Sequence, residues 1–153
     1  AWEGAPNWYS AYLERAPDRQ VLSLSPELFL EVDRPRKRIV TRPLKGTVAA
    51  SGRRASLESS VKDEAELNMI VDLMRNDLGR TCEYGSVRVT QPRAIESHPT
   101  VHHGVATIEG RLCDGVGLVE ILRAAFPPGS ITGAPKIRAM QIINEVEAFE
   151  RSA

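Results

Sequence analysis

The sequence predicts an α+β fold in which a largely antiparallel sheet packs with helices. Segments rich in β-branched and alternating apolar residues come early, over Val21–Ser25, Leu28–Val32 and Arg38–Arg42. Helices and strands then follow one another without strict alternation. A doubly wound parallel sheet would alternate the two regularly and would normally carry a glycine-rich phosphate loop, which this sequence lacks.

The helices of this prediction come from the later part of the chain. Ser60 and Asp63 resemble a capping box, and apolar residues at helical spacing continue to Gly79, which is well placed to end the helix. Residues 117–126 are apolar and predict a second helix. A last helix has Pro135 in its first turn. Its expected core contacts include Ile137, Met140, Ile143 and Val146.

Two more strands and a loop complete the expected order. Residues 86–90 predict a short strand and residues 101–112 a longer one. In the longer strand the adjacent His102 and His103 point to opposite faces, since side chains alternate along a strand. Residues 48–58 are small and polar and predict a loop.

Composition narrows the classes of function. The 153 residues, 42% of them hydrophobic, suit one domain or a large part of one. Lys+Arg and Asp+Glu both number 20, and this zero net charge argues against binding to nucleic acid or a membrane surface. No apolar stretch is long enough to cross a bilayer. Cys82 and Cys113 match no metal spacing, so we expect reduced thiols in a cytoplasmic protein.

Lys45 is the most informative single residue. It lies between Pro43, which fixes a backbone torsion, and Gly46, which permits close approach of the backbone to a ligand. The surrounding residues have strand character, so Lys45 is not a solvated charge on a helix. The segment predicts a lysine held over a substrate. A surface lysine in a turn is the alternative, and residues 42–47 taken alone favour it.

Asp63 and Glu66 are candidate ligands for Mg²⁺. They are three residues apart on a predicted helix, so both carboxylates lie on one face. Hard oxygen donors are what Mg²⁺ takes from proteins, with water and substrate filling the remaining positions. The simpler interpretation, which spacing alone favours, makes Asp63 a capping acid and Glu66 a solvated charge. Further along this helix, Asp72 and Arg75 suggest either an amphipathic face or a buried ion pair.

Three other features have chemical potential. A neutral His103 suits hydrogen bonding or proton transfer near neutral pH, although most strand histidines are structural. Glu27 interrupts two strand segments, where partial burial would favour a general acid. The loop over residues 129–134 precedes a helix and offers backbone N–H groups and hydroxyls to an anionic or hydroxylated ligand. An ordinary capped loop is the alternative.

The order of these segments and the residues within them identify a resemblance. The segments are Ser25–Glu27, Arg42–Thr47, Lys62–Asp77, Val101–His103 and Gly129–Met140. Together they closely resemble the chorismate-binding enzymes, the family that includes aminodeoxychorismate, anthranilate, isochorismate and salicylate synthases. The resemblance extends from about residue 21 to residue 147.

The resemblance implies a role for each candidate residue. Glu27 matches the family's general acid, Lys45 its nucleophile, and His103 a histidine near the ring and its leaving group. The matches to substrate-contacting positions are Ser130, Thr132 and Gly133. Glu66 matches a Mg²⁺ ligand and Asp63 the carboxylate beside it, where relatives often have glutamate.

Lys45 also separates the branches of the family. Members that aminate chorismate at C4 carry lysine in this motif, whereas anthranilate-forming members usually carry alanine. The resemblance therefore implies formation of 4-amino-4-deoxychorismate, on the route to p-aminobenzoate and folate, with ammonia supplied by a glutamine amidotransferase. Two alternatives stay open. One is an anthranilate synthase component I, and the other is a non-catalytic module that binds the amidotransferase.

The extent of the resemblance predicts a partial domain. Residues 1–153 are expected to be the central portion of a single chorismate-binding catalytic domain, truncated at both ends. The family's second glutamate pair for the metal and its basic residues for the enolpyruvyl carboxylate lie further toward the C-terminus. We therefore expect this polypeptide alone to be inactive on chorismate. We also expect its truncated sheet to expose apolar surface and unpaired edges.

Overall fold

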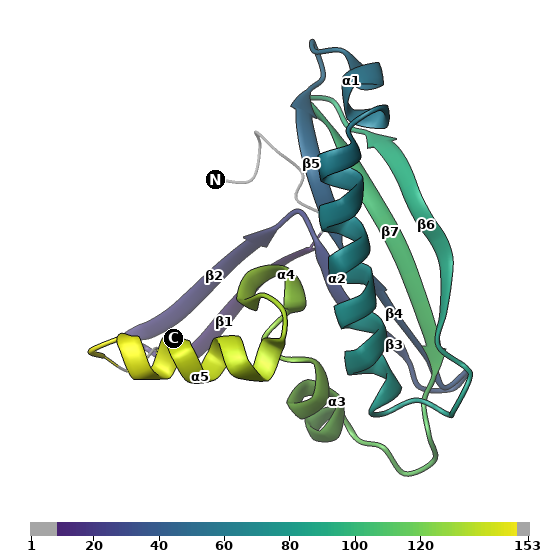
Figure 1. The fold of residues 1–153 in the computed structure, drawn as a ribbon. Coiled ribbons are helices and arrows are strands. Elements are labelled where there is room, and N and C mark those ends of the chain that lie inside the picture. The colour runs from purple at the N-terminus through teal and green to yellow at the C-terminus, as the bar shows by residue number, and fades with distance from the viewer. Residues whose placement is uncertain (1–8, 150–153) are drawn as a thin grey trace.

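The computed structural model describes residues 9–149, which form two antiparallel sheets and five helices (Figure 1). The strands are β1 (Tyr9–Ala16), β2 (Arg19–Ser25), β3 (Leu28–Asp33), β4 (Arg38–Arg42), β5 (Leu44–Ala49), β6 (Arg88–Ser97) and β7 (Val101–Arg111). The helices are α1 (Arg54–Glu58), α2 (Val61–Gly79), α3 (Leu118–Ala125), α4 (Gly129–Thr132) and α5 (Lys136–Val146). The antiparallel sheets packed with helices confirm the predicted fold class.

Strand β7 is the centre of the five-stranded sheet. It pairs with β6 along one edge, and with β4 and β5 in succession along the other, while β3 pairs with β4. Pro43 separates β4 from β5, yet its carbonyl accepts a hydrogen bond from the N–H of Ala106 at 3.0 Å, so pairing continues across the break. A β-bulge between Leu44 and Thr47 then locally re-aims the chain around Lys45.

Helix α2 covers one face of this sheet and forms the core with it (Figure 1). Its N-terminus is capped by Ser60, whose hydroxyl accepts a hydrogen bond from the N–H of Asp63 at 3.2 Å. The apolar positions recur every three or four residues, so they form one stripe against the strands. The buried contacts across this interface include Leu67, Ile70, Met74 and Leu78 of the helix and Ile39, Ala106 and Ile108 of the sheet.

The opposite face of the sheet is largely polar. Arg38 donates two hydrogen bonds to Glu109, at 2.9 and 2.8 Å. Arg42 donates to Thr107 at 3.3 Å and also pairs with Glu96. Because side chains alternate along β7, His103 lies on this polar face with Thr107 and Glu109, and His102 lies on the other face, as predicted for the two histidines.

The β1–β2 hairpin and α5 extend to one side of the five-stranded sheet (Figure 1). The hairpin exposes apolar residues on both faces: Tyr12 pairs with Leu22 on one, and Leu13 with Val21 on the other. This exposed apolar surface was expected from the partial domain. Within residues 9–149, no helix combines the length and apolar character that crossing a membrane would require.

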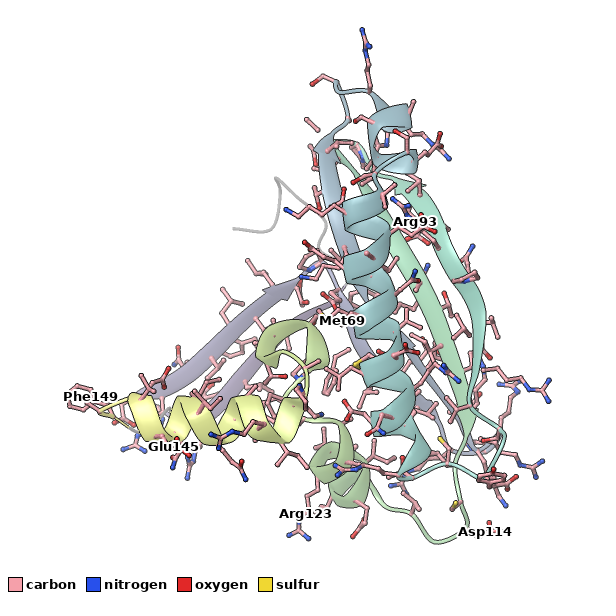
Figure 2. All side chains as sticks on the ribbon, in the orientation of Figure 1. Met69, Arg93, Asp114, Arg123, Glu145 and Phe149 are labelled. Atoms are coloured by element: carbon pink, nitrogen blue, oxygen red, sulfur yellow. The ribbon has the colours of Figure 1, made fainter. Side chains whose placement is uncertain are left out.

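Two local predictions were wrong and one strand was missed, because tertiary contacts override local pattern. The predicted loop over residues 48–58 contains the end of β5 and helix α1, which is anchored by the buried side chain of Leu57. Arg93 of β6, labelled in Figure 2, donates a hydrogen bond to the carbonyl of Leu57 and so holds this helix in place. Strand β6 continues to Ser97, well past the predicted end, because a bulge between Gln91 and Ala94 accommodates Pro92. Strand β1 was not predicted at all.

One packing alternative is decided, and one packing expectation was wrong. The Asp72–Arg75 pair forms at 2.9 Å with side chains 75% and 52% exposed, so it belongs to the exposed face of an amphipathic helix and is not a buried ion pair. In α5, Ile137, Met140 and Val146 are 57%, 42% and 76% exposed and contribute little to the described core. Their helical spacing is real, but only short segments of the described chain pack against this helix.

Candidate functional site

Glu27, Lys45 and Ser130 converge from three separate elements. Glu27 lies in the turn between β2 and β3, where its backbone N–H donates to the hydroxyl of Ser25 at 3.2 Å. Lys45 lies at the bulge in β5, and Ser130 lies on α4. The Ser130 hydroxyl and the N–H of Leu44 both donate to the Glu27 carboxylate, and the charge of Lys45 acts on the same group.

The pKa of Glu27 is raised above its ordinary value, chiefly because burial disfavours the charged carboxylate. The Ser130 hydrogen bond, the positive charge of Lys45 and the Leu44 N–H all oppose this rise. A carboxyl with this balance keeps a proton more readily than a solvated glutamate does. It therefore has the property required of a general acid.

Gly46 brings the N-terminal part of α2 against the strand that carries Lys45. Its φ of +79° lies in the left-handed region that favours glycine. A Cβ at this position would lie 2.5 Å from Cδ1 of Leu57 and 3.0 Å from Cβ and Cγ of Asp63. The absence of a side chain therefore lets Asp63 lie directly beside the residue that follows Lys45.

His103 lies close to Lys45 along the sheet. It pairs in register with Thr47, whose hydroxyl is 2.8 Å from Nδ1 of the imidazole. Burial lowers the pKa of His103; the neighbouring His98 lowers it further, and Glu96 opposes both. The ring is thus biased toward its neutral form, with Nδ1 engaged and Nε2 left for other chemistry. His102 lies on the other face and contacts Ser97 at 2.9 Å.

The donors for a divalent cation are incomplete within the described residues. Asp63 and Glu66 lie one helical turn apart on α2, half-buried, with Glu66 also 3.9 Å from the Lys62 ammonium. Residues 9–149 contain no group of three or more His, Cys, Asp or Glu side chains arranged to hold a metal. Two carboxylates still fit Mg²⁺, which commonly takes one or two from a protein and completes its shell with water and substrate oxygens.

Thr132 and Gly133 follow Ser130 at the end of α4. The Thr132 hydroxyl donates to the carbonyl of Pro128 at 3.2 Å, and Gly133, with a φ of +112°, follows α4. Thr132 also lines a cavity of about 580 Å³. The rest of the lining is Pro127, Met140, Ile143, Asn144, Glu147, Ala148 and Phe149. Of the predicted site residues that the structure describes, Thr132 alone contributes to this lining.

A buried ion pair near the site was missed by sequence reasoning. Nζ of Lys136 lies 2.7 Å from Oδ2 of Asp77, and their side chains are 7% and 2% exposed. Burial raises the pKa of Asp77, and the Lys136 ammonium opposes that rise. One signal was present, because Asp77 falls at core spacing after Ile70 and Met74 on the same helix.

Comparison with known proteins gives matches along nearly the whole chain. The family model described as chorismate binding enzyme matches residues 2–153. Aminodeoxychorismate synthase component 1 of Salmonella typhimurium is 49% identical over 95% of the chain, which covers 33% of that protein. An anthranilate synthase component 1 of Haloarcula marismortui is 45% identical over 95% of the chain and is covered over 30% of its length.

A solved structure shares the fold. The anthranilate synthase component I from Streptococcus pneumoniae superposes with a TM-score of 0.80 at 35% identity, over 95% of this chain and 32% of that one. The chain thus spans about a third of the length of the relatives that it matches.

Proposed function

The chain belongs to the chorismate-binding enzyme family, and we propose that it is part of an aminodeoxychorismate synthase component I. The substrate would be chorismate, and the product 4-amino-4-deoxychorismate, for p-aminobenzoate and folate synthesis in the cytoplasm. Relatives that carry this name are similar over nearly the whole chain. The "component 1" of that name supports a partner, which we propose is a glutamine amidotransferase that supplies ammonia.

The observation that carries this proposal is the environment of Glu27, a partly buried carboxyl that accepts a hydrogen bond from Ser130 and is influenced by the positive charge of Lys45. In the proposed reaction the amine of Lys45 bonds to the chorismate ring while the C4–O bond breaks. Glu27 protonates the departing hydroxyl, which leaves as water. Ammonia then bonds to C4 and returns a proton to the Glu27 carboxylate, while the bond from the ring to Lys45 breaks and its electron pair restores the free amine.

The two roles require an unprotonated amine and a protonated carboxyl, because an ammonium is not nucleophilic and a carboxylate is not an acid. Burial of Glu27 disfavours its charge and so favours the protonated carboxyl. His103, biased toward its neutral form, would hydrogen-bond the ring or its leaving hydroxyl. Ser130, Thr132 and Gly133 would contact the substrate from the segment around α4.

We propose Mg²⁺ as the metal, held through Glu66 directly and through Asp63 directly or through water. When bound, the ion would hold the ring carboxylate of chorismate and stabilise its negative charge. Asp63 lies beside Gly46, next to the proposed nucleophile, and Glu66 follows it one helical turn later, so metal ligands here would serve the same substrate. Glu66→Gln is expected to raise the Mg²⁺ concentration needed for half-maximal activity. Asp72→Asn, on the exposed part of the same helix, is the matched control.

The deciding experiment measures products from the full-length catalytic subunit that contains these residues. The subunit receives chorismate, ammonia and Mg²⁺, beside its Lys45→Ala variant and a control, Lys37→Ala. Lys37 pairs with Asp114 at the other end of the sheet and is remote from the site. We expect aminodeoxychorismate from the subunit and the control, and at least a 100-fold loss or a diversion toward anthranilate from Lys45→Ala.

Other outcomes would identify the alternatives. Anthranilate from the unaltered subunit would make it an anthranilate synthase component I. The 45% identical Haloarcula relative, which carries that name, is the reason to test this alternative. Binding to an amidotransferase without any turnover would indicate a non-catalytic module. The 153 residues alone are expected to give no product, because they span only about a third of the length of the relatives that they match.

A further inference from the structure

The buried Lys136–Asp77 pair joins the C-terminal end of α2 to the first residue of α5. Besides the carboxylate at 2.7 Å, Nζ of Lys136 donates to the carbonyls of Ala125 at 3.0 Å and Pro127 at 3.3 Å. The three donors of one ammonium are therefore all used, and the acceptors lie on two stretches of chain, α2 and the end of α3 with the residues that follow it. The pair fastens the start of α5 to both α2 and the end of α3.

A second contact fastens the same segment a few residues earlier. Gly129 is buried, and a Cβ there would lie 2.6 Å from Cδ2 and 2.9 Å from Cγ of Leu73 on α2. The chain from Pro127 to Lys136 is thus held on α2 near both of its ends. Between these two contacts lies Ser130, whose hydroxyl donates to Glu27.

We propose that Lys136 and Asp77 are positioning residues, which hold the Ser130 segment on α2 so that Ser130 meets Glu27 and the substrate. The inference rests on the proposed function, because it assigns the segment to the chorismate site. Lys136 and Asp77 do not contact the reacting atoms themselves. They act indirectly, by holding α4 in position.

The contacts explain why a charged residue occupies this position. Replacing both members of a buried ion pair by neutral residues of similar size is often neutral for stability, whereas removing one leaves an uncompensated charge. The pair therefore contributes little net stability that an apolar pair would lack. What an apolar side chain cannot do is donate to the carbonyls of Ala125 and Pro127. The specific property of Lys136 is this set of directional bonds.

The test uses the full-length subunit with the double substitution Asp77→Asn and Lys136→Met, which keeps side-chain volume and removes both charges. Arg138→Met is the control, since Arg138 pairs with Glu145 at 3.4 Å on the same helix, with both side chains more than half exposed. Figure 2 shows Glu145 toward the outer end of α5, away from α2. The readouts are melting temperature, kcat and KM for chorismate, and hydrogen exchange of amides 126–136.

We expect the double variant to melt within a few degrees of the parent. Its KM for chorismate should rise about tenfold or more, with a smaller change in kcat, and amides 126–136 should exchange faster. Arg138→Met should leave all readouts unchanged. A double variant with the parental KM, or with parental exchange over 126–136, would overturn the proposal. If the parent subunit does not use chorismate, the proposed function fails, and hydrogen exchange alone decides whether the pair holds the segment.

Discussion

The five-stranded sheet with α2 and the hairpin with α5 differ in how they are stabilised. Under α2, apolar residues such as Leu67 and Ile108 are fully buried, and the polar groups of the opposite face are paired with one another. In the hairpin, Leu22 and Leu24 are exposed on a two-stranded ribbon, a structure of marginal stability by itself. The first region has a core of its own, and the second does not.

The candidate site lies where these two regions meet. Lys45 belongs to the sheet, Glu27 to the turn that joins the hairpin to the sheet, and Ser130 to the segment that leads into α5. In the proposed reaction, the nucleophile would come from the region that has its own core. The acid and the donor to that acid would come from segments whose position depends on fewer contacts. The geometry of the site therefore depends on where the hairpin and the segment leading into α5 lie relative to the sheet, more than on how stable they are by themselves.

The largest expected effect tests the core directly. Leu67→Ala removes a fully buried side chain between α2 and the sheet and should lower the free energy of unfolding by about 2–5 kcal/mol. Leu22→Ala removes a side chain that is 57% exposed, and should change it by less than about 0.5 kcal/mol. Urea unfolding of the 153-residue chain, followed by circular dichroism, measures both.

An equal loss of unfolding free energy from the two substitutions would contradict the distinction between the two regions. It would mean that the hairpin is covered in solution, for example by a second copy of the chain. Sedimentation velocity at the same protein concentrations would then show association. A monomer with equal losses would leave the assignment of the core to α2 without support.

The next effect concerns the close approach at Gly46. Gly46→Ala should destabilise the protein by about 2–4 kcal/mol, because it combines a positive φ with a clash against Leu57 and Asp63. Gly85→Ala is the matched control, since its φ of +73° is similar but a Cβ there meets nothing within 4 Å. The control should cost about 1–2 kcal/mol in the same unfolding measurement. Equal costs would show that backbone conformation, and not the contact with α2, makes glycine necessary at position 46.

A smaller effect is expected at the start of α2. Ser60→Ala removes the hydroxyl that accepts the N–H of Asp63 and should cost about 1 kcal/mol. Ser59→Ala changes the preceding serine, whose hydroxyl bonds Ala55 within α1, and should cost less. If the proposed metal ligation is correct, Ser60→Ala should also weaken Mg²⁺ dependence, because Asp63 loses part of its orientation. Equal free energies of unfolding for the two serine variants would show that the Ser60 cap does not stabilise α2.

The sequence predicted the elements whose pattern is local. The apolar stripe of α2, its start at Ser60 and its end at Gly79 follow from helical spacing and capping, and all were confirmed. The opposite orientation of His102 and His103 followed in the same way from strand alternation. These features depend on residues a few positions apart, so a single sequence contains the information.

The sequence did not predict contacts between distant residues. The Lys136–Asp77 pair spans 59 positions, and its lysine stands at the start of a helix that otherwise looked like an ordinary amphipathic one. Helix α1 depends on Leu57 and Arg93, which are 36 positions apart. The convergence of Glu27, Lys45 and Ser130 was implied only by resemblance to a family. The structure adds the contacts of Ser130 and Leu44 with Glu27, while the roles of these residues stay predictions.

The last prediction concerns the boundary itself and leaves stability nearly unchanged. The hydrogen bond from Ser130 lowers the pKa of Glu27 against the rise that burial causes, so Ser130→Ala should raise that pKa. A general acid acts in its protonated form, and activity falls as pH rises through its pKa. The basic limb of kcat/KM for chorismate should therefore move to higher pH in the full-length subunit. Ser86→Ala, at the far end of β7, where the hydroxyl accepts the N–H of Arg111, should leave the profile in place. A shift to lower pH, or the same profile in both variants, would mean that Ser130 does not set the pKa of Glu27. The role of α4 would then be purely structural.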